Sequence, residues 1–123
     1  MKVSDILGKK GNAVYAATSD LTVYDALRLM GEKNIGALPV IDNGQLKGII
    51  SERDYARKVV LQNRSSKEMK VSEIMTANVI TVTADDTLEQ CMQLMSDKRI
   101  RHLPVMDNGQ VIGILSISDI VTA

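Results

Sequence analysis

Two stretches decide the fold of this chain: residues 38–45 read LPVIDNGQ, and residues 103–110 read LPVMDNGQ. The likeness extends outward from them, because residues 18–55 agree with residues 83–120 at roughly half of their positions when the sequence is shifted by 65. The chain therefore contains an internal duplication. A unit of about sixty residues buries little apolar surface, so two such copies are expected to pair in a pseudo-twofold arrangement, with clefts at their junction.

Length and composition limit the class of protein. A chain of 123 residues with 45% hydrophobic content suits one compact folding unit that contains both copies. Fifteen basic and fifteen acidic residues cancel, and the aromatic residues are three tyrosines, so no nucleic-acid partner is expected. The one cysteine excludes an intramolecular disulfide, and the first residues lack the apolar run of a signal peptide or a membrane span. A cytoplasmic protein without a membrane partner is predicted.

Each copy shows the same order of predicted elements. In the second copy, residues 71–75 indicate a short helical turn and residues 79–82 a short β-branched strand. A helix should follow Asp85, Asp86 and Thr87, which supply capping oxygens and negative charge at its start. Its apolar face recurs with helical spacing at Leu88, Cys91, Met92 and Met95, and in the first copy at Val23, Ala26, Leu27 and Met30.

A hairpin and a final helix complete each copy. Apolar runs at residues 37–41 and 46–50 flank an Asn-Gly step, which favours the positive φ angles of a tight turn, and residues 102–106 and 111–115 repeat this pattern. Ser51 and Ser116 then open the final helices; the first of these continues to Leu61 and the second is shorter.

The predicted fold class is therefore α/β (α+β), with two pseudo-twofold-related β-α-β-β-α repeats. The repeats are expected at residues 1–64 and 71–123, joined by an exposed polar linker at residues 65–70. The first copy carries three extra residues at or near Lys9, Lys10 and Gly11, because its opening turn matches the second copy at an offset of 68 and its first strand at 65. This insertion is expected to lengthen a loop beside the cleft.

At this point the residues resemble a known family. The strings G-I-x-S-x-x-D at residues 48–54 and 113–119, each behind the same hairpin, are similar to tandem CBS domains packed as one CBS pair (a Bateman module). Residues 51–58 further resemble small stand-alone bacterial proteins of this type. The resemblance implies a regulatory module, commonly a homodimer, that binds an adenine nucleotide such as AMP, ATP or NAD between the repeats and acts on an unidentified partner protein.

The resemblance also assigns roles to Asp54 and Asp119. A carboxylate can accept both hydroxyls of a ribose, and a helix N-terminus favours both its charge and a nearby phosphate. Ser51 and Ser116 would help to hold the sugar or phosphate. The alternative is purely structural, because Ser-x-x-Asp is also a helix capping box in the wider sense, and both interpretations can hold at once.

Further ligand contacts follow from the same resemblance. Ile35 with Gly36, and Ile100 with Arg101, would line flat adenine pockets; the segment 11–15, with Tyr15, would close one pocket, and Ile80 belongs to the other. Asp54 is paired with Arg101 and His102, which would grip the phosphate, with help from Arg53, Arg57 and Lys58. Without the resemblance, Arg101 and His102 would read equally well as a solvated strand start.

The second predicted site, at Asp119, is expected to be weaker or empty. Where Arg101 and His102 serve the first site, this site would receive Gly36 and Ala37, which offer no cation. The small residues leave room for a bulkier ligand, so NAD stays among the candidates.

No catalytic or metal-binding set is visible in the sequence. One histidine and one cysteine in different elements form neither a triad nor a metal-ligand spacing, so Cys91 and the methionines are expected to pack the core. The chain is predicted to be no enzyme, since His102 lacks an orienting acid. The leading hypothesis is an adenine-nucleotide sensor; the alternative is a ligand-free dimerisation scaffold.

Overall fold

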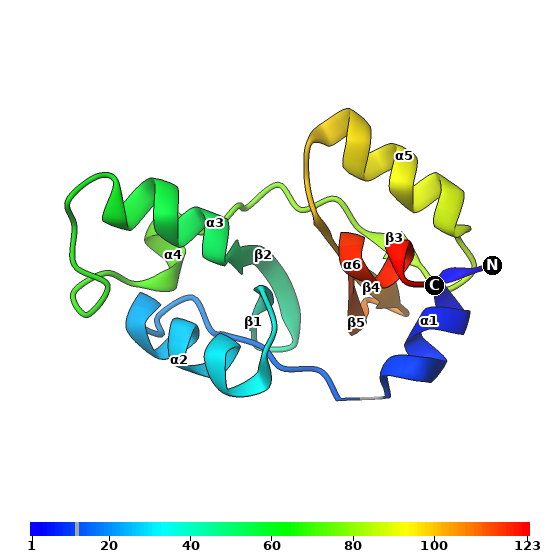
Figure 1. The fold of residues 1–123 in the computed structure, drawn as a ribbon. Helices are drawn as coiled ribbons and strands as arrows, with labels where there is room; N and C mark the ends of the chain where they lie inside the picture. The colour runs from blue at the N-terminus through cyan, green and yellow to red at the C-terminus, as the bar shows by residue number, and fades with distance from the viewer. Residues whose placement is uncertain (12) are drawn as a thin grey trace. The chain divides into compact units, whose positions relative to one another are not determined.

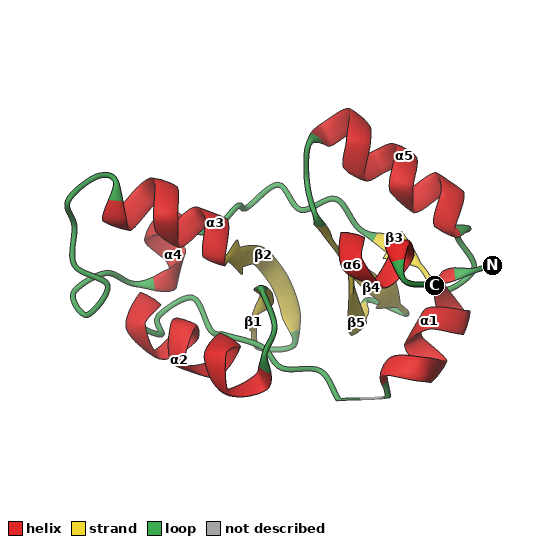
Figure 2. Cartoon of the chain, in the orientation of Figure 1, coloured by secondary structure: helices red, strands yellow, loops and turns green. Residues whose placement is uncertain are grey.

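The computed structural model describes residues 1–11 and 13–123, which form two compact units (Figure 1). One unit comprises Tyr15–Val79, and the other comprises Met1–Val14 with Ile80–Ala123. Both units contain helices and a small β-sheet, as Figure 2 shows by colour. The predicted α/β class is confirmed, with two repeats of one fold.

The Tyr15–Val79 unit is built on one hairpin. Strands β1 (Ala37–Asp42) and β2 (Gln45–Ser51) pair antiparallel, and α2 (Val23–Lys33) precedes them in the chain. After β2 come α3 (Glu52–Tyr55), a π-helical segment (Ala56–Val60) and α4 (Val71–Ile74). The buried core of this unit contains Ala17, Val23, Ala26, Met30, Leu38, Val40, Ile50, Val59, Met69, Val71 and Ile74.

The other unit repeats this plan. Strand β3 (Val82–Thr83) runs parallel to β4 (His102–Asp107), which pairs antiparallel with β5 (Gln110–Ser116). Its helices are α1 (Val3–Lys10), α5 (Leu88–Lys98) and α6 (Ile117–Val121). The buried core here contains Val3, Ile6, Val82, Leu88, Cys91, Met95, Leu103, Val105 and Leu115.

The two hairpin turns match the prediction from the Asn-Gly steps. Asn43 and Gly44 have φ angles of 51° and 77°, and Asn108 and Gly109 have φ angles of 50° and 77°. Two successive positive φ angles suit the right-handed twist of the flanking strands, and Asn and Gly adopt them at low cost. Both strands of each hairpin extend slightly beyond the predicted bounds.

The long helix of the second copy begins after the predicted capping residues, and the helix of the first copy has an equivalent cap. The Thr87 hydroxyl accepts from the Gln90 amide, and the Thr22 hydroxyl accepts from the Asp25 amide. Their apolar faces are buried as expected, with Cys91 and Met95 in one core and Met30 in the other. The helix after Ser51 continues to Val60, with its last turn in π-helical form.

The predicted first strand is much shorter than expected. Of residues 79–82, only Val82 belongs to a strand, where it pairs with Val105, and in the first copy the corresponding feature is a single parallel bridge from Ala17 to Val40. The strand begins at Val82, three residues later than predicted, and it ends at Thr83, whose amide donates to the Asp86 carboxylate and so starts a turn.

The opening helices are exchanged between the copies. The amides of Val3 and Ser4, in α1, donate to the carbonyls of Asp86 and Ala84 in the second copy. In the same way, the amides of Val71 and Ser72, in α4, donate to the carbonyls of Leu21 and Ser19 in the first copy. Accordingly, α1 at the blue end of the colour scale lies beside β5, near the red end (Figure 1). The spatial units therefore cross the repeat boundaries predicted from the sequence.

The three-residue insertion extends a helix, whereas the sequence analysis expected a longer loop. Helix α1 has 8 residues and includes Lys9 and Lys10, but α4 has 4. Gly11, with a φ of 88°, ends the helix by donating its amide to the carbonyl of Leu7. Lysines in the last turn interact favourably with the helix dipole, which explains why the inserted residues continue the helix.

The predicted linker is polar and mostly exposed, but it is anchored at one end. Met69 is only 4% exposed, and the carbonyls of Met69 and Ser66 accept from the first amides of α2. This segment therefore helps to position α2. Among the described residues, no helix is both long enough and apolar enough to cross a bilayer.

Candidate ligand-binding sites

Asp54 is part of a capping box at the start of α3. Its Oδ2 accepts from the Ser51 amide at 3.0 Å and lies 3.1 Å from the Ser51 hydroxyl, while that hydroxyl accepts from the Asp54 amide. The other oxygen, Oδ1, lies 3.2 Å from Nζ of Lys58, which also donates to the carbonyl of Ile74. The capping contacts expected from the Ser-x-x-Asp pattern are thus present, and they leave acceptor capacity on Oδ1.

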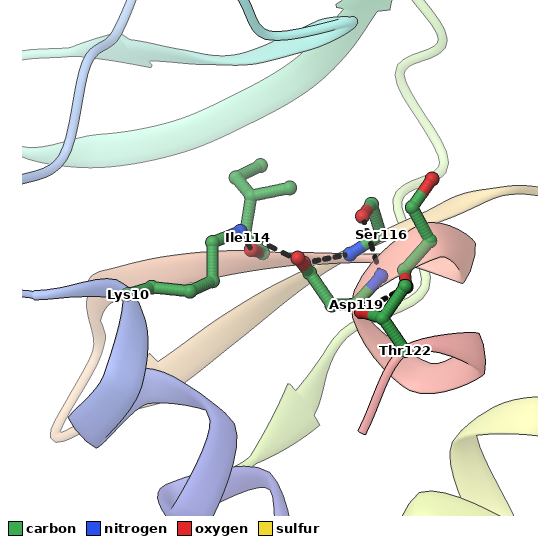
Figure 3. A network of polar contacts seen from close by, with 6 residues as sticks. Lys10, Ile114, Ser116, Asp119 and Thr122 are labelled. Atoms are coloured by element: carbon green, nitrogen blue, oxygen red, sulfur yellow. Dashed lines mark hydrogen bonds and ion pairs between the residues drawn. The ribbon is translucent and has the colours of Figure 1, made fainter.

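Asp119 caps α6 in the same way but has a different lysine neighbour. Its Oδ2 accepts from the Ser116 amide at 2.8 Å, and the Ser116 hydroxyl accepts from the Asp119 amide at 3.1 Å. The same Oδ2 accepts from Nζ of Lys10 at 2.8 Å (Figure 3). Lys10 also donates to the carbonyl of Ile114 at 2.7 Å.

These contacts change the acidity of Asp119. Burial alone would raise its pKa, but the hydrogen bonds from Lys10 and Ser116, together with the positive charge of Lys10, outweigh burial and lower the pKa. Asp119 is therefore a carboxylate at neutral pH, and its charge is partly neutralised by Lys10.

His102 lies close to this second aspartate. It is paired with Ser116 across β4 and β5, so that the two side chains share one face of the hairpin. Burial lowers the pKa of His102, the charges of Lys10 and Arg101 lower it further, and Asp119 opposes them. The imidazole is consequently neutral at pH 7. Arg101 is exposed, and its carbonyl accepts from the Ile117 amide.

The predicted pairing of Asp54 with Arg101 and His102 joins residues of different units. Asp54 lies in the Tyr15–Val79 unit, whereas Arg101 and His102 lie with Asp119 in the other unit. That pairing stays a prediction. What the structure does bring together is Lys10, His102, Ser116 and Asp119, a set that the sequence analysis did not assemble.

Ile35 and Gly36, the predicted adenine contacts, line a cavity of about 420 Å³. The Glu52 amide donates to the Gly36 carbonyl and so fixes α3 against this wall. Neither Ser51 nor Asp54 lines this cavity. The remaining lining residues come from α2, its C-cap and α3: Leu27, Met30, Gly31, Asn34, Glu52 and Tyr55. Glu52 and Tyr55 were not predicted site residues, although their spacing of three residues places both on one helix face.

The remaining predicted site residues are scattered. The ring of Tyr15 is half-exposed and has Nζ of Lys33 at 4.9 Å from its centroid. Ile80 and Ile100 pack against the core of the other unit. Arg53 is on α3 and already has an interaction partner in the chain. Asn12, in the segment expected to close a pocket, lies outside the described residues.

The sequence indicates Lys58 as a help in holding the phosphate, but it does not connect Lys10 with Asp119. Lys58 stands four residues after Asp54, a spacing at which opposite charges meet on a helix. Lys10 is 109 positions away from Asp119, so no local pattern connects them. Only the exchange of α1 into the second copy places Lys10 there.

Other reactive groups are not arranged for catalysis in the part of the chain that the structure describes. No cluster of three or more His, Cys, Asp or Glu side chains suited to a metal occurs among residues 1–11 and 13–123. Cys91 is fully buried, and burial raises the pKa of its thiol, which disfavours the reactive thiolate.

Two repeats of a capped hairpin-helix unit with exchanged opening helices define a pair of CBS domains. The CBS domain family matches residues 3–61 and 71–123, so the chain belongs to this family. Relatives that match most of the chain are described as CBS domain-containing proteins.

Three relatives illustrate the likeness. The mitochondrial CBS domain-containing protein CBSX3 of Arabidopsis thaliana is 46% identical over 98% of this chain, which spans 63% of the plant protein. A protein with CBS domains from Burkholderia ambifaria is 50% identical with a TM-score of 0.95, covering 99% of this chain and 92% of that one. The CBS pair of MJ0100, solved with 5′-methylthioadenosine and S-adenosyl-L-methionine, is 34% identical with a TM-score of 0.88, covering 99% and 94%.

Proposed function

We propose that this chain is a sensor of adenosine-containing ligands, and that Asp54 accepts the ribose hydroxyls. The observation that carries the proposal is the Asp54 carboxylate, whose Oδ2 is held by Ser51 while Oδ1 keeps acceptor capacity. The MJ0100 relative supports the class of ligand, because that protein was solved with two adenosyl compounds.

The fixed geometry of Asp54 suits a vicinal diol. The capping box prevents rotation of the carboxylate, so little conformational entropy is lost when a ligand binds. The N-terminus of α3 adds a favourable field for the carboxylate, and Lys58 is near enough to respond to a ligand phosphate. Charge-assisted hydrogen bonds from two hydroxyls would orient the sugar.

The rest of the ligand would be held by less polar contacts. The wall formed by Ile35 and Gly36 offers a surface for a flat base. Tyr15 would supply an aromatic contact to the same base. Arg101 and His102 are the proposed phosphate grip, because they provide bidentate and titratable donors. AMP, ATP, NAD and S-adenosyl compounds all share the adenosine moiety that this arrangement would recognise.

Regulation would follow if the ligand binds one arrangement of the repeats or protomers more tightly than another. A bound ligand shifts the packing of the repeats, or of two protomers in a homodimer, only to the extent that it prefers one arrangement. The homodimer, the regulated partner and the cytoplasmic location are parts of this proposal. The name of the plant relative places that protein in mitochondria.

A ligand-free interaction scaffold is the second candidate. One observation favours it: Val60 and Leu61, at the end of the π-helical segment, are 52% and 75% exposed. Exposed apolar side chains of this kind suit a protein contact.

Calorimetric titration with AMP, ATP, NAD, S-adenosylmethionine and 5′-methylthioadenosine tests the proposal. Saturable binding of any of them supports the sensor, and Asp54→Ala should then weaken it by about tenfold to hundredfold. Unchanged affinity in D54A would remove Asp54 from the site. If none of the five ligands gives a binding signal and the protein self-associates in sedimentation experiments, the scaffold is favoured.

Loss of a helix cap needs its own control, because D54A also removes a capping contact. Thr22→Ala removes a comparable N-cap from α2 and leaves Asp54 untouched. We expect T22A to lower the melting temperature without changing the affinity. If T22A weakened binding as much as D54A does, the loss would reflect stability and not a ligand contact.

A further inference from the structure

In the Tyr15–Val79 unit, a lysine joins the capping aspartate to the end of an opening helix. Nζ of Lys58 lies 3.2 Å from Oδ1 of Asp54 and donates to the carbonyl of Ile74 at 2.9 Å. Ile74 is the last residue of α4, and the last carbonyls of a helix have no partner within that helix. Lys58 supplies such a partner and thereby fastens the end of α4 to Asp54.

The other unit makes the same connection from the opposite end. Here the lysine belongs to the opening helix: Lys10 is the last residue of α1, and its Nζ lies 2.8 Å from Oδ2 of Asp119. The ammonium group also donates to the carbonyl of Ile114 at 2.7 Å (Figure 3). Ile114 is paired with Pro104, whose nitrogen has no hydrogen to donate. In each unit, one ammonium group therefore links the capping aspartate to the end of the opening helix.

Both links lie close to the points where the chain passes from one unit to the other. Helix α1 ends at Lys10, and the chain leaves this unit after Val14. Helix α4 ends at Ile74, and the chain leaves the Tyr15–Val79 unit after Val79. Each lysine therefore fastens the helix end from which a crossing segment departs.

The lysine is the partner in each link that can move. The side chains of Lys58 and Lys10 are 45% and 37% exposed, whereas those of Asp54 and Asp119 are 14% and 21% exposed. Both aspartates are also held by the amide of the serine in their capping box. Ion pairs with so exposed a partner contribute little to stability, so a competing group can replace them at small cost.

We infer that these links transmit ligand binding from the carboxylate to the crossing segment. A phosphate carries a charge of about −1.5 to −2 at pH 7, against one negative charge on a carboxylate, so it attracts an ammonium group more strongly. When ribose hydroxyls occupy Oδ1 of Asp54 and the phosphate attracts Lys58, the lysine leaves the carbonyl of Ile74 and the end of α4 loosens. The inference rests on the proposed function, because it assumes that Asp54 accepts ribose hydroxyls.

Amide exchange measured by NMR tests the inference, with AMP as the probe at a concentration that calorimetry shows to be saturating. The reporter is the Met75 amide, which donates to the carbonyl of Val71 at 3.0 Å and closes the last turn of α4. A ligand that only stabilises the fold slows exchange throughout the unit. We expect AMP to speed exchange at Met75 by about fivefold while the amides of β1 and β2 exchange more slowly.

Lys58→Met removes the ammonium group and keeps the apolar stem of the side chain. Without ligand, K58M should already show the faster exchange at Met75, and AMP should not speed it further. Asp54→Asn retains a capping side chain but not the charge, so ligand-free D54N should also speed exchange at Met75. Lys47→Met, at an exposed position of β2, is the control for loss of one positive charge and should behave like the parent.

The link at Lys10 has its own test without ligand. Lys10→Met should speed exchange of the Gly11 amide, which donates to the carbonyl of Leu7 and ends α1. Lys9→Met, on the neighbouring residue, is the matched control and should leave this amide unchanged once the rates are corrected for neighbouring side chains. Equal rates in K10M and K9M would remove Lys10 from the inference.

The outcomes separate this inference from the proposed function. If the parent binds AMP but exchange at Met75 slows or stays the same, the inference falls and the proposed function stands. If ligand-free K58M exchanges like the parent, Lys58 fastens nothing and the inference falls. If no adenosine compound binds the parent, both ideas fall. Should K58M fail to fold, ligand-free D54N decides, because it opens the same link at its other end.

Discussion

Nζ of Lys10 donates to Oδ2 of Asp119 at 2.8 Å and so joins the end of α1 to the start of α6, although 109 positions separate the two residues. The contact joins the N-terminal segment to the second copy. It also lowers the pKa of Asp119 against the effect of burial. A carboxylate with a lowered pKa stabilises the folded state at neutral pH, and this stabilisation is lost in acid.

The first prediction concerns acid stability. Because the folded-state pKa of Asp119 is below its unfolded value of about 3.9, its contribution is complete above that value and disappears as the pH falls through the folded-state pKa. Lys10→Met should lower the free energy of unfolding at pH 7 and flatten its decrease between about pH 5 and 2. Urea unfolding at stepped pH measures both effects. An acid profile of K10M parallel to that of the parent would contradict the pairing, and K9M serves as the control.

The second prediction concerns His102 and a phosphate. In the free protein, burial and the charges of Lys10 and Arg101 lower the pKa of His102, so a bound phosphate must raise it. Affinity for AMP should then be greatest at low pH and decrease as the pH rises through the bound-state pKa. Since a phosphate group itself titrates near pH 6, the measurement is the difference between the parent and His102→Asn. Identical profiles of the two proteins from about pH 5.5 to 8 would remove His102 from the site.

The third prediction compares two glycines in equivalent strand positions. A Cβ at Gly48 would lie 2.7 Å from the backbone oxygen of Thr76, whereas a Cβ at Gly113 would meet the tip of the Leu7 side chain at 2.6 Å. A side-chain tip can move aside, but a hydrogen-bonded backbone oxygen cannot do so without losing its bond to Ile49. Gly48→Ala should therefore destabilise the protein by about 1–3 kcal/mol, and Gly113→Ala by less. Equal losses in thermal unfolding would show that both contacts relax alike.

The fourth prediction tests the exchange of the opening helices. Ile6, in α1, is buried in the core that contains β4 and β5, and Ile74, in α4, is buried in the core that contains β1 and β2. Each replacement by alanine should cost about 2–5 kcal/mol. Hydrogen exchange should show that Ile6→Ala first exposes the amides of β4 and β5, while Ile74→Ala first exposes those of β1 and β2. The opposite assignment would mean that each helix belongs to its own repeat.

Local sequence signals predicted the regular elements well. The Asn43-Gly44 turn, the Thr87 cap and the Ser51–Asp54 capping box depend on residues within a few positions of one another, and all three are present. The periodic burial of Cys91 and Met95 follows from helical spacing alone. The strand predicted at residues 79–82 was overestimated, because only Val82 of that range pairs with β4.

The candidate site was predicted only in part, because its contacts are not local. The cavity beside Ile35 and Gly36 also contains Glu52 and Tyr55, which join it when α3 packs against the wall that α2 and Gly36 form. His102 was assigned to Asp54 by analogy, yet its described neighbours are Lys10, Ser116 and Asp119. Which residues surround a charge depends on how distant segments pack.

The amino-acid sequence by itself determined that there are two copies, where their hairpins turn and which serine and aspartate cap each final helix, because these features follow from backbone preferences and short-range hydrogen bonds. Only the tertiary structure decided that α1 joins the second copy and α4 the first, and that the inserted Lys10 therefore lies against Asp119. The physical reason is that Val3 and Ile6 are buried in a core formed with residues between Val82 and Leu115. Such long-range burial is not determined by any local pattern in the chain.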